Sequence, residues 1–317
     1  MTKHKVPKIE ELIEAGVHFG HQIRRWNPKM EPYIYTVSKN VHIIDLEDTE
    51  RLLKEACEFL YERAAEGKKI VFVGTKKQSK DIVKGEAVRC GAMYVNERWI
   101  GGTVTNFPTI KKNLDKLIKY IRGKETGEFE MYTKKERLLI DREVEKMNLV
   151  YGGILNLTEI PDIVFVIDPR REKTAVKEAK LAGIPVVAVV DTNADPTGID
   201  YIIPGNDDAI KSVALLVRTV ADAIEEGYNE FDRKGKAQEK KEQKEKEAQE
   251  KKEVVVTATE SPVVTTDVEE LEEKLVEADE PKKPVKIVEE ESEDEVEVGD
   301  DSKKAKPVKK EKAKKSK

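Results

Sequence analysis

The chain has 317 residues, of which 38% are hydrophobic and 38% are charged, with a formal net charge of −5 at pH 7. Acidic and basic residues nearly balance in residues 1–233, which argues against the domain-wide basic surface that simple duplex binding requires. No stretch approaches the roughly 18 consecutive apolar residues of a membrane span, and MTKHKVPKIEELIEAG has no signal-peptide core, so we expect a cytoplasmic protein without a membrane partner.

The N-terminal region combines cations with aromatic rings in GVHFGHQIRRWNPKMEPYIY, residues 16–35. A short helix is predicted before this segment, over residues 9–15, and two strands overlap or follow its end, over residues 33–37 and 41–44. Pro28 and Pro32 predict an irregular backbone for the segment, because each removes a donor and restricts its neighbour. Cations for phosphates and rings for stacking are the means by which proteins bind looped RNA. Residue types alone leave a second interpretation open, a cationic edge of an ordinary core with Trp26 buried.

Apolar runs that alternate with helical patterns predict a parallel sheet covered by helices. Runs such as KIVFVG and PVVAVV are apolar throughout, which is typical of strands buried on both faces. Strand, helix and strand at this spacing form right-handed crossover units. The predicted strands are residues 69–74, 92–95, 162–167, 185–190 and 201–203, and the predicted helices are residues 45–66, 78–90, 172–182 and 207–226. Cys57 and Cys90 lie in these helices and are expected to be buried thiols rather than a disulfide.

The segment between residues 105 and 150 interrupts the alternation with two polar helices. These are predicted over residues 107–122 and 134–150, and they form a hairpin with a thin apolar seam. The seam is expected to pack Leu114, Leu117, Ile118 and Ile121 on Leu138, Leu139, Val144 and Met147. Such a hairpin has too little apolar surface to be a layer of the core, so it stands off the sheet. A solvated spur and a partner-binding arm are both compatible with this pattern.

Residues 231–317 are predicted to be a disordered, charged tail. KGKAQEKKEQKEKEAQEKKE can form a transient helix through opposite-charge pairs. The remainder is rich in Val, Glu, Lys and Pro without a periodic apolar face, so it cannot bury enough surface to offset the chain entropy. The basic end can contact polyanions, although a solvated tail is the better interpretation of such a charge run.

The expected carboxyl ends of the strands carry polar residues, but no complete catalytic set. The segment after residue 73 is neither a phosphate-binding P-loop nor a dinucleotide motif, and no nucleophile elbow occurs. Asp191 and Asp195 could hold Mg²⁺ or a ribose, or make Asx turns, which is the favoured interpretation. The spacing of His18 and His21 is compatible with Zn²⁺ or Mg²⁺, yet no carboxylate or cysteine pair completes a four-ligand set. We therefore expect no cofactor, no metal and no small-molecule substrate.

Six motifs resemble the bacterial-type second protein of the small ribosomal subunit. They are GVHFGHQIRRWNPKMEPYIY, VHIIDL, KIVFVGTKKQ, NERWIGGTVTNFPTI, DIVFVIDPRRE and GIPVVAVVDTNADPTGIDYIIPGNDDAIKSV. They occur in the family's order and spacing over residues 9–228, and the long tail is not covered. The resemblance implies a flavodoxin-like α/β fold, with parts at residues 1–45 (N-terminal helix, arm and first strands), 46–104 and 151–230 (sheet domain), 105–150 (inserted hairpin) and 231–317 (tail).

The resemblance also implies a function without catalysis. Family members are structural components of the small subunit that contact its rRNA near the junction of head and body. They also help to dock the multi-OB-fold ribosomal protein that captures mRNA. The positions that match the family's motifs imply RNA contacts at Arg24, Arg25, Trp26, Lys29, Arg98, Trp99, Lys111 and Lys112. Two alternatives remain, a nucleotide-binding α/β enzyme that uses Lys76, Asp168 and Asp191, and a protein-docking module in which RNA contact is incidental.

Overall fold

A computed structural model describes residues 5–258 of the chain, with side chains for residues 5–235. The chain divides into two units, Met1–Lys252 and Glu253–Lys317. All elements discussed below belong to the first unit, except that the last helix continues into the second. The disordered tail was predicted over residues 231–317; residues 231–258 instead continue the last helix, and residues 259–317 lie outside the described part of the chain.

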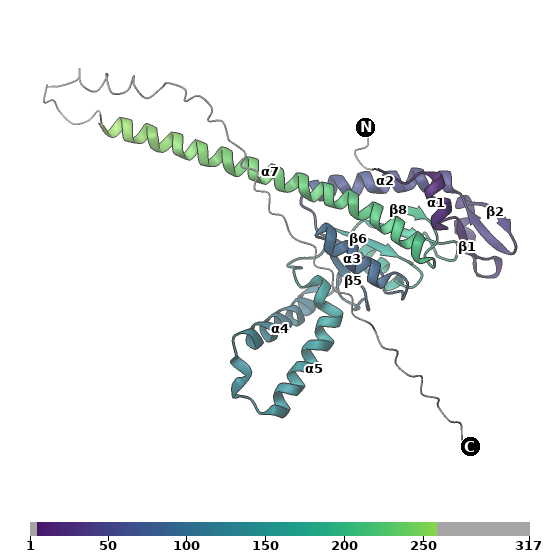
Figure 1. Cartoon of the computed structure of the whole chain (residues 1–317), viewed down its shortest axis with the longest axis horizontal. Coiled ribbons are helices and arrows are strands. Elements are labelled where there is room, and N and C mark those ends of the chain that lie inside the picture. The colour runs from purple at the N-terminus through teal and green to yellow at the C-terminus, as the bar shows by residue number, and fades with distance from the viewer. Residues whose placement is uncertain (1–4, 259–317) are drawn as a thin grey trace, which may run out of the picture. The chain divides into compact units, whose positions relative to one another are not determined.

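A five-stranded parallel sheet forms the centre of the first unit (Figure 1). Its strands are β4 (Ile70–Val73), β5 (Met93–Val95), β6 (Ile163–Ile167), β7 (Val186–Val190) and β8 (Tyr201–Pro204). They are arranged in the order β5-β4-β6-β7-β8 with parallel pairing throughout. This is the flavodoxin-like order 2-1-3-4-5, which confirms the expected fold. We call the sheet and its covering helices the platform.

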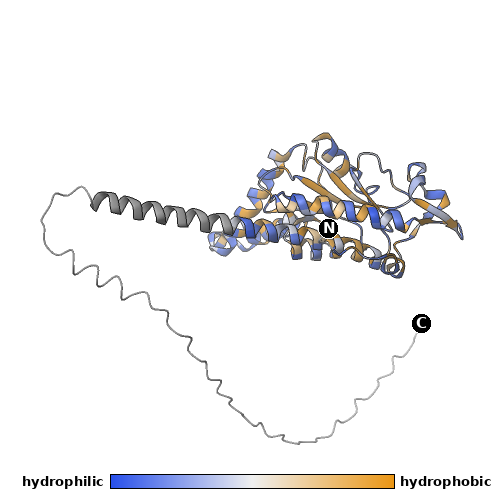
Figure 2. Cartoon of the chain, turned by 90° about the horizontal axis from the view of Figure 1, so that it is seen from above, coloured by the Kyte–Doolittle hydropathy of each residue, from blue (hydrophilic) through white to orange (hydrophobic). Residues whose placement is uncertain are grey.

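Alternate residues of each strand enter two separate cores, one on each face of the sheet, and the strands of this sheet are coloured as hydrophobic in Figure 2. On one face, Phe72 and Phe165 pack with α1 (Ile9–Ala15), α2 (Leu46–Ala65), α3 (Lys80–Cys90) and the start of α7 (Ile210–Ala258). On the other face, Val73 and Val166 pack with α4 (Phe107–Glu125) and α6 (Lys173–Leu181). Burial on both faces explains why these strands are apolar at every position. Cys57 and Cys90 are free and buried in the first core, as expected.

A small antiparallel sheet precedes the platform, and it contains one strand that the sequence analysis missed. Its order is β1-β3-β2, with β1 at Phe19–Gln22, β2 at Ile34–Ser38 and β3 at Val41–Ile44. The segment of residues 16–35 was expected to be irregular, but its first part is β1, which pairs with β3. The prolines that motivated the expectation come later, in a 3₁₀ helix over Pro28–Tyr33. Lys39 and Asn40 adopt positive φ in the turn between β2 and β3, as a tight hairpin turn requires.

Helices α4 and α5 (Lys134–Tyr151) form the predicted hairpin between β5 and β6 (Figure 1). Leu114 and Leu117 of α4 are buried as expected, but no residue of α5 is buried. The predicted seam is therefore wrong at Leu138 and Leu139, which are 50% and 54% exposed. Ion pairs supply part of the contact between the two helices instead, as between Lys116 and Glu143 at 2.6 Å. A thin seam leaves enough solvent-exposed surface on α5 for apolar residues to point outward.

Helix α7 is much longer than the pattern over residues 207–226 predicted, because it runs from Ile210 to Ala258. The turn that leads into it is closed by Asn206, whose Oδ1 accepts the amides of Asp208 at 2.8 Å and Ala209 at 3.1 Å. Residues 234–252 alternate lysine with glutamate, and such pairs three or four positions apart favour helix. Of the described helices, none is both long enough and apolar enough to cross a bilayer.

Candidate nucleic-acid interface

The arm, residues 16–35, is fixed to the carboxyl end of β7 through one threonine. The amide of His21 donates to Thr192 Oγ1 at 2.8 Å, and the amide of Asn27 donates to the Thr192 carbonyl at 2.8 Å. A Cβ on Gly20 would lie 2.6 Å from the Thr192 side chain, so this approach requires glycine. These contacts join residues that are about 170 positions apart in sequence, and they make the arm a fixed part of the platform.

Two of the exposed cations of the arm lie on its short 3₁₀ turn, Ile23–Arg25. Arg24 and Arg25 are both exposed, and neither makes an ion pair of 4.0 Å or less among the described residues. Trp26, which follows them, is half-buried and packs on His42 with ring centroids 5.0 Å apart and a 31° tilt. One side of the indole is therefore occupied by the protein. The predicted pairing of base-stacking and phosphate-binding groups is thus geometrically possible here, with the arginines as the accessible part.

Lys29, the fourth predicted contact of the arm, is held by the loop after β7. Its Nζ lies 3.1 Å from Asp195 Oδ2 and donates to Thr197 Oγ1 at 2.8 Å. Hydrogen bonds from the side chain and amide of Thr197, together with Lys29, keep the pKa of Asp195 below its usual value. The hydrogen bond from the Thr197 amide to Asp195 Oδ1, at 2.9 Å, closes the Asx turn that was favoured for Asp195. Because this ion pair is exposed, it is worth at most about 1 kcal/mol, and Lys29 stays available to a phosphate.

The next two predicted contacts lie in the loop at the root of the hairpin, and they differ in their exposure to solvent. Arg98 is exposed, whereas Trp99 is 7% exposed and its Nε1 donates to Glu178 Oε1 at 3.3 Å. A ring buried in the core cannot stack on a base, so a direct RNA contact by Trp99 is not supported. Glu178 Oε1 also accepts the amide of Gly102, whose φ is 90°. Trp99 and Glu178 therefore set the course of the loop from which Arg98 projects.

The last two predicted contacts lie in the first turns of α4, at the root of the hairpin. Lys111 and Lys112 are both exposed. Lys111 Nζ donates to the Thr158 carbonyl at 3.2 Å, which ties it to the segment that returns from the hairpin. Among the described residues, no hydrogen bond or ion pair holds the Lys112 side chain. Lys112 is thus the freer of the two cations.

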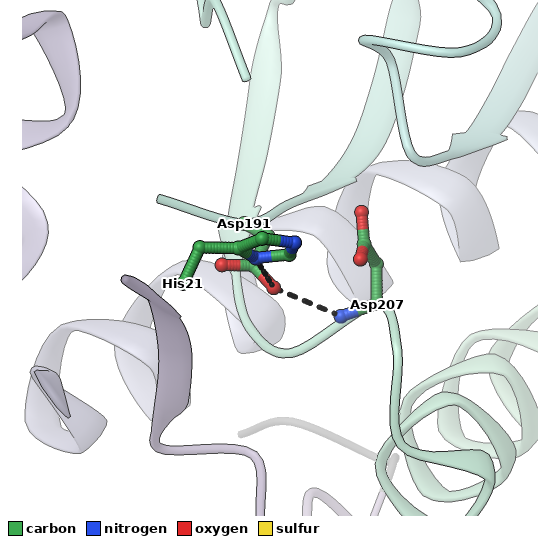
Figure 3. Close-up of side chains that lie close together, drawn as sticks. All are labelled: His21, Asp191 and Asp207. Carbon is green, nitrogen blue, oxygen red and sulfur yellow. Dashed lines mark hydrogen bonds and ion pairs between the residues drawn. The ribbon is translucent and has the colours of Figure 1, made fainter. Parts of the chain in front are cut away.

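The arm also contributes to a polar cluster at the carboxyl edge of the sheet, which the sequence analysis did not assemble (Figure 3). His21 Nδ1 lies 3.0 Å from Asp191 Oδ2, and His21 Nε2 lies 3.2 Å from Asp208 Oδ2. The hydrogen bond with Asp191 raises the pKa of His21 against the opposing effect of burial, and neighbouring carboxylates add to the rise. Asp191 itself accepts from Thr192, at 2.5 Å from the amide and 3.0 Å from Oγ1. It therefore does not make the Asx turn that was favoured for it.

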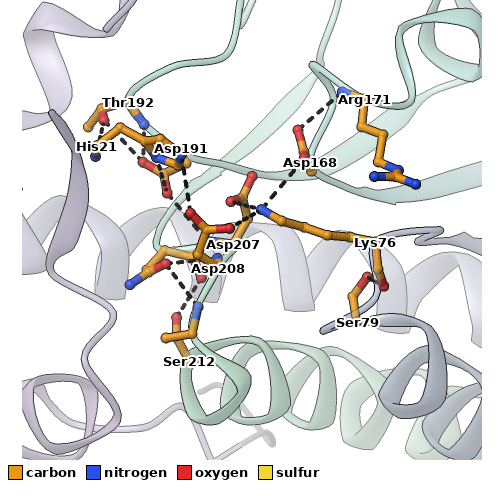
Figure 4. A network of polar contacts seen from close by, with 12 residues as sticks. His21, Lys76, Ser79, Asp168, Arg171, Asp191, Thr192, Asp207, Asp208 and Ser212 are labelled. Carbon is orange, nitrogen blue, oxygen red and sulfur yellow. Dashed lines mark hydrogen bonds and ion pairs between the residues drawn. The ribbon is translucent and has the colours of Figure 1, made fainter. Parts of the chain in front are cut away.

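Lys76 is the central cation of the same network (Figure 4). Its Nζ lies 2.7 Å from Asp207 Oδ1, 2.5 Å from Asp208 Oδ1 and 3.7 Å from Asp168 Oδ2. Burial, followed by the charges of Asp191 and Asp168, raises the pKa of Asp207 to about 7, although Lys76 opposes the rise. Burial acts in the same direction on Asp208, but the hydrogen bond and charge of Lys76 keep its pKa below the usual value. One ammonium group is thus shared by several carboxylates.

This cluster could hold a divalent cation, although not through the expected histidine pair. Ligand atoms of His21, Asp191 and Asp207 lie within 4.8 Å of one another, and such nitrogen and oxygen donors suit Zn²⁺. His18 is not part of the set, because its ring lies against Phe19 with centroids 3.9 Å apart. The carboxylates that the sequence analysis did not find beside the histidines are therefore those of Asp191 and Asp207, which follow the ends of β7 and β8. The ammonium group of Lys76 beside Asp207 would compete with a metal.

The arrangement does not favour the nucleotide-binding alternative. Ligands of this fold class bind where the strand order reverses, which here is between β4 and β6. Lys76 and Asp168 do meet at that point, but Lys76 is already neutralised by carboxylates. The nearby Thr75 hydroxyl is bonded to the buried carboxylate of Glu172. Little of the charge of Lys76 is therefore left for a phosphate at this point.

A flavodoxin-like platform that carries exposed cations on projections from the sheet is the arrangement of a binding protein. Comparison with known sequences agrees with this class. Residues 12–227 match the family model of ribosomal protein S2. The chain is 52% identical over 219 residues to small ribosomal subunit protein uS2 of Geotalea uraniireducens, which covers 69% of this chain and 86% of that protein. It is 52% identical over 222 residues to the uS2 protein of Petrotoga mobilis, covering 70% and 77% of the two chains.

The chain therefore belongs to the ribosomal protein S2 family. It is a structural constituent of the small ribosomal subunit and not an enzyme, and it acts in translation in the cytoplasm. In that particle it associates with rRNA and with other ribosomal proteins. The family match ends at residue 227, so it does not extend to the charged C-terminal segment.

Proposed function

We propose that the chain holds rRNA near the junction of the head and body of the small subunit through two projections of one platform. The first is the arm with Arg24, Arg25 and Lys29, and the second is the hairpin root with Arg98 and Lys112. Cations on rigid supports bind a folded RNA with little loss of their own conformational freedom. The observation that carries the proposal is the attachment of the arm to Thr192, because it fixes the distance between the two projections.

The small antiparallel sheet supports a second part of the proposal, the docking of a neighbouring protein. Strand β2 is an edge of this sheet, and Tyr35 and Val37 on it are 74% and 47% exposed. Tyr35 lies at an irregularity in the pairing of β2 with β3, and its exposed ring and the nearby Val37 side chain add apolar surface beside the unpaired backbone groups of this edge. This surface is suited to a protein partner, and we assign it to the multi-OB-fold protein that captures mRNA.

Reconstitution of small subunits with the full chain tests the proposal. Arg24→Glu with Arg25→Glu places negative charge where phosphate contact is proposed, so we expect at least a tenfold loss of incorporation. The matched control is Lys54→Glu with Lys84→Glu, because both lysines are exposed and lie on α2 and α3, which carry no proposed RNA contact. Normal incorporation of the arm variant would exclude the arm as an rRNA contact. Normal incorporation combined with loss of the neighbouring protein would favour the protein-docking module instead.

A further inference from the structure

Every charged side chain on the exposed face of helix α6 is cationic. Between residues 168 and 184 the acids are Asp168, Glu172 and Glu178, and all three are buried. The cations of the same stretch are all exposed, and they are Arg170, Arg171, Lys173, Lys177 and Lys180. The surface is therefore far more basic than the nearly neutral body to which it belongs.

The structure provides little local compensation for these charges. Among the described residues, no ion pair of 4.0 Å or less involves Arg170, Lys173, Lys177 or Lys180, and Arg171 reaches the buried Glu172 at only 3.9 Å. Lys173 and Lys177 are like charges four positions apart, which destabilises a helix. Arg170, Arg171 and Lys173 also surround the N-terminus of α6, where the helix dipole disfavours cations. The arrangement is thus unfavourable for the helix itself and favourable for an anionic partner.

The geometry of the row indicates which anion it fits. A helix rises about 1.5 Å per residue, so Lys173, Lys177 and Lys180 form a row about 10 Å long on one side of α6. Lysine ammonium groups bind phosphates as mobile point charges. No aromatic residue occurs in α6 to stack on an unpaired base. Charge without stacking suits the backbone of a duplex, where RNA is recognised through phosphates and shape rather than through its bases.

The cationic row and the loop at the hairpin root are joined by hydrogen bonds to one buried carboxylate. Glu178 belongs to α6, and its carboxylate accepts the amides of Gly102, Val104 and Thr105 in the loop that leads to the hairpin. The buried face of α6 thus positions the loop that carries Arg98, while the exposed face carries the lysines. A single RNA could contact both without any movement of the protein.

We propose that the exposed face of α6 binds the phosphate backbone of an rRNA duplex, as a contact distinct from the arm and the hairpin root. This inference rests on the proposed rRNA-binding function and adds a surface and an RNA structure to it. Removing the three lysine charges removes up to three phosphate contacts. Each such contact contributes about 0.9 to the slope of log K against log salt concentration.

The test measures salt-dependent binding of the full-length protein to a small-subunit rRNA transcript and to a short, fully paired RNA duplex. Lys173→Gln/Lys177→Gln/Lys180→Gln is expected to reduce the slope by about 2–3, so that the affinity loss between about 50 and 200 mM salt shrinks by a factor on the order of 10–40. The matched control, with glutamine at three other exposed lysines, is expected to keep the slope, and its positions are Lys8, Lys54 and Lys84.

The outcomes separate this inference from the function on which it rests. An unchanged slope for the α6 variant, combined with weakened binding by the Arg24→Glu/Arg25→Glu variant, would overturn the α6 contact and leave the proposed function intact. Absence of measurable rRNA binding by the unmodified protein would overturn both. A larger effect of the α6 variant on an unpaired RNA strand than on the duplex would refute the assignment to a duplex backbone.

Discussion

Glu178 allows a sharp test of how the platform holds the root of the hairpin. Its carboxylate is 7% exposed, and it accepts from Trp99 Nε1 at 3.3 Å and from the amides of Gly102 at 2.8 Å and Val104 at 3.1 Å. It also accepts from the amide and hydroxyl of Thr105, each at 3.3 Å. Glu178→Gln keeps the size of the side chain but replaces one accepting oxygen with an NH₂ group. Whichever way the amide turns, a donor of the side chain then faces donors of the loop.

The cost follows from the number of donors that lose their acceptor. A buried donor without a partner costs about 1–3 kcal/mol. Val104 and Thr105 share one carboxylate oxygen, and the amide of Thr105 is only partly buried, so we expect Glu178→Gln to lower the free energy of unfolding by about 2–3 kcal/mol. That is a large fraction of the roughly 5–15 kcal/mol that stabilises a typical domain.

Urea unfolding and amide hydrogen exchange measure this effect directly. Burial acts to raise the pKa of Glu178, but hydrogen bonds from Gly102, Val104 and Thr105 outweigh burial and lower it. A carboxyl with a lowered folded-state pKa stabilises the protein above its unfolded pKa of about 4.3, and the contribution is lost as the pH falls through the folded value. The difference between the unmodified protein and the Gln variant is therefore expected to be full at pH 7 and to shrink below about pH 4.

The amides of the loop provide a local readout of the same contact. In the Gln variant, the amides of Gly102, Val104 and Thr105 are expected to exchange faster than in the unmodified protein, including through local openings that leave the sheet intact, whereas the sheet amides accelerate only as far as global unfolding does. Glu145→Gln on the exposed part of α5 is the control, with an expected change within about 0.5 kcal/mol. If Glu178→Gln changed the free energy of unfolding by no more than this control does, and left exchange of the loop amides unaltered, the role of Glu178 would be refuted.

Two further predictions concern other parts of the fold. Gly153→Ala would place a Cβ 2.1 Å from the Tyr94 carbonyl, so we expect urea unfolding to show a free energy of unfolding lower by about 2–4 kcal/mol. In the control Gly85→Ala, in α3, the new Cβ meets nothing within 4 Å, and the free energy of unfolding is expected to rise by about 0.5–1 kcal/mol. Equal effects of the two substitutions would contradict the close packing at Gly153. Burial raises the pKa of Asp207 to about 7, so its ionisation destabilises the fold as the pH rises from about 4 to above 7. Asp207→Asn is therefore expected to raise Tm at pH 8 in the absence of metal. The same variant is expected to abolish any rise in Tm caused by Zn²⁺. A lower metal-free Tm for that variant at pH 8 would show that the charge of Asp207 is stabilising.

Sequence predicted the platform well because its strands are buried on both faces. Val71 and Phe72, for example, enter different cores, so both must be apolar, and the run is recognisable without its neighbours. Strand β1 was missed because its four residues are polar, aromatic or glycine and none of them is buried. Its position depends on pairing with β3 and on Thr192, neither of which leaves a local pattern in the segment.

The candidate interface was predictable only as far as exposure follows from residue type. Arg24 and Arg25 are exposed as cations usually are, whereas Trp99 belongs to a core whose partners lie elsewhere in the chain. The cluster of Asp191 with Asp207 could have been foreseen, since the ends of neighbouring parallel strands meet at one edge. The addition of His21 could not, because it depends on the course of the arm.

The attachment of the arm to Thr192 has a consequence for the newly made chain. His21 is synthesised 171 residues before its partner, and at about 5–20 residues per second this interval lasts on the order of 10–30 s. Asn206, which donates to the carbonyl of Gly16 at 3.1 Å, is made later still. The first segment to emerge is thus among the last to reach its final shape, and the arginines cannot be presented in their native arrangement until the last strand of the sheet has been translated.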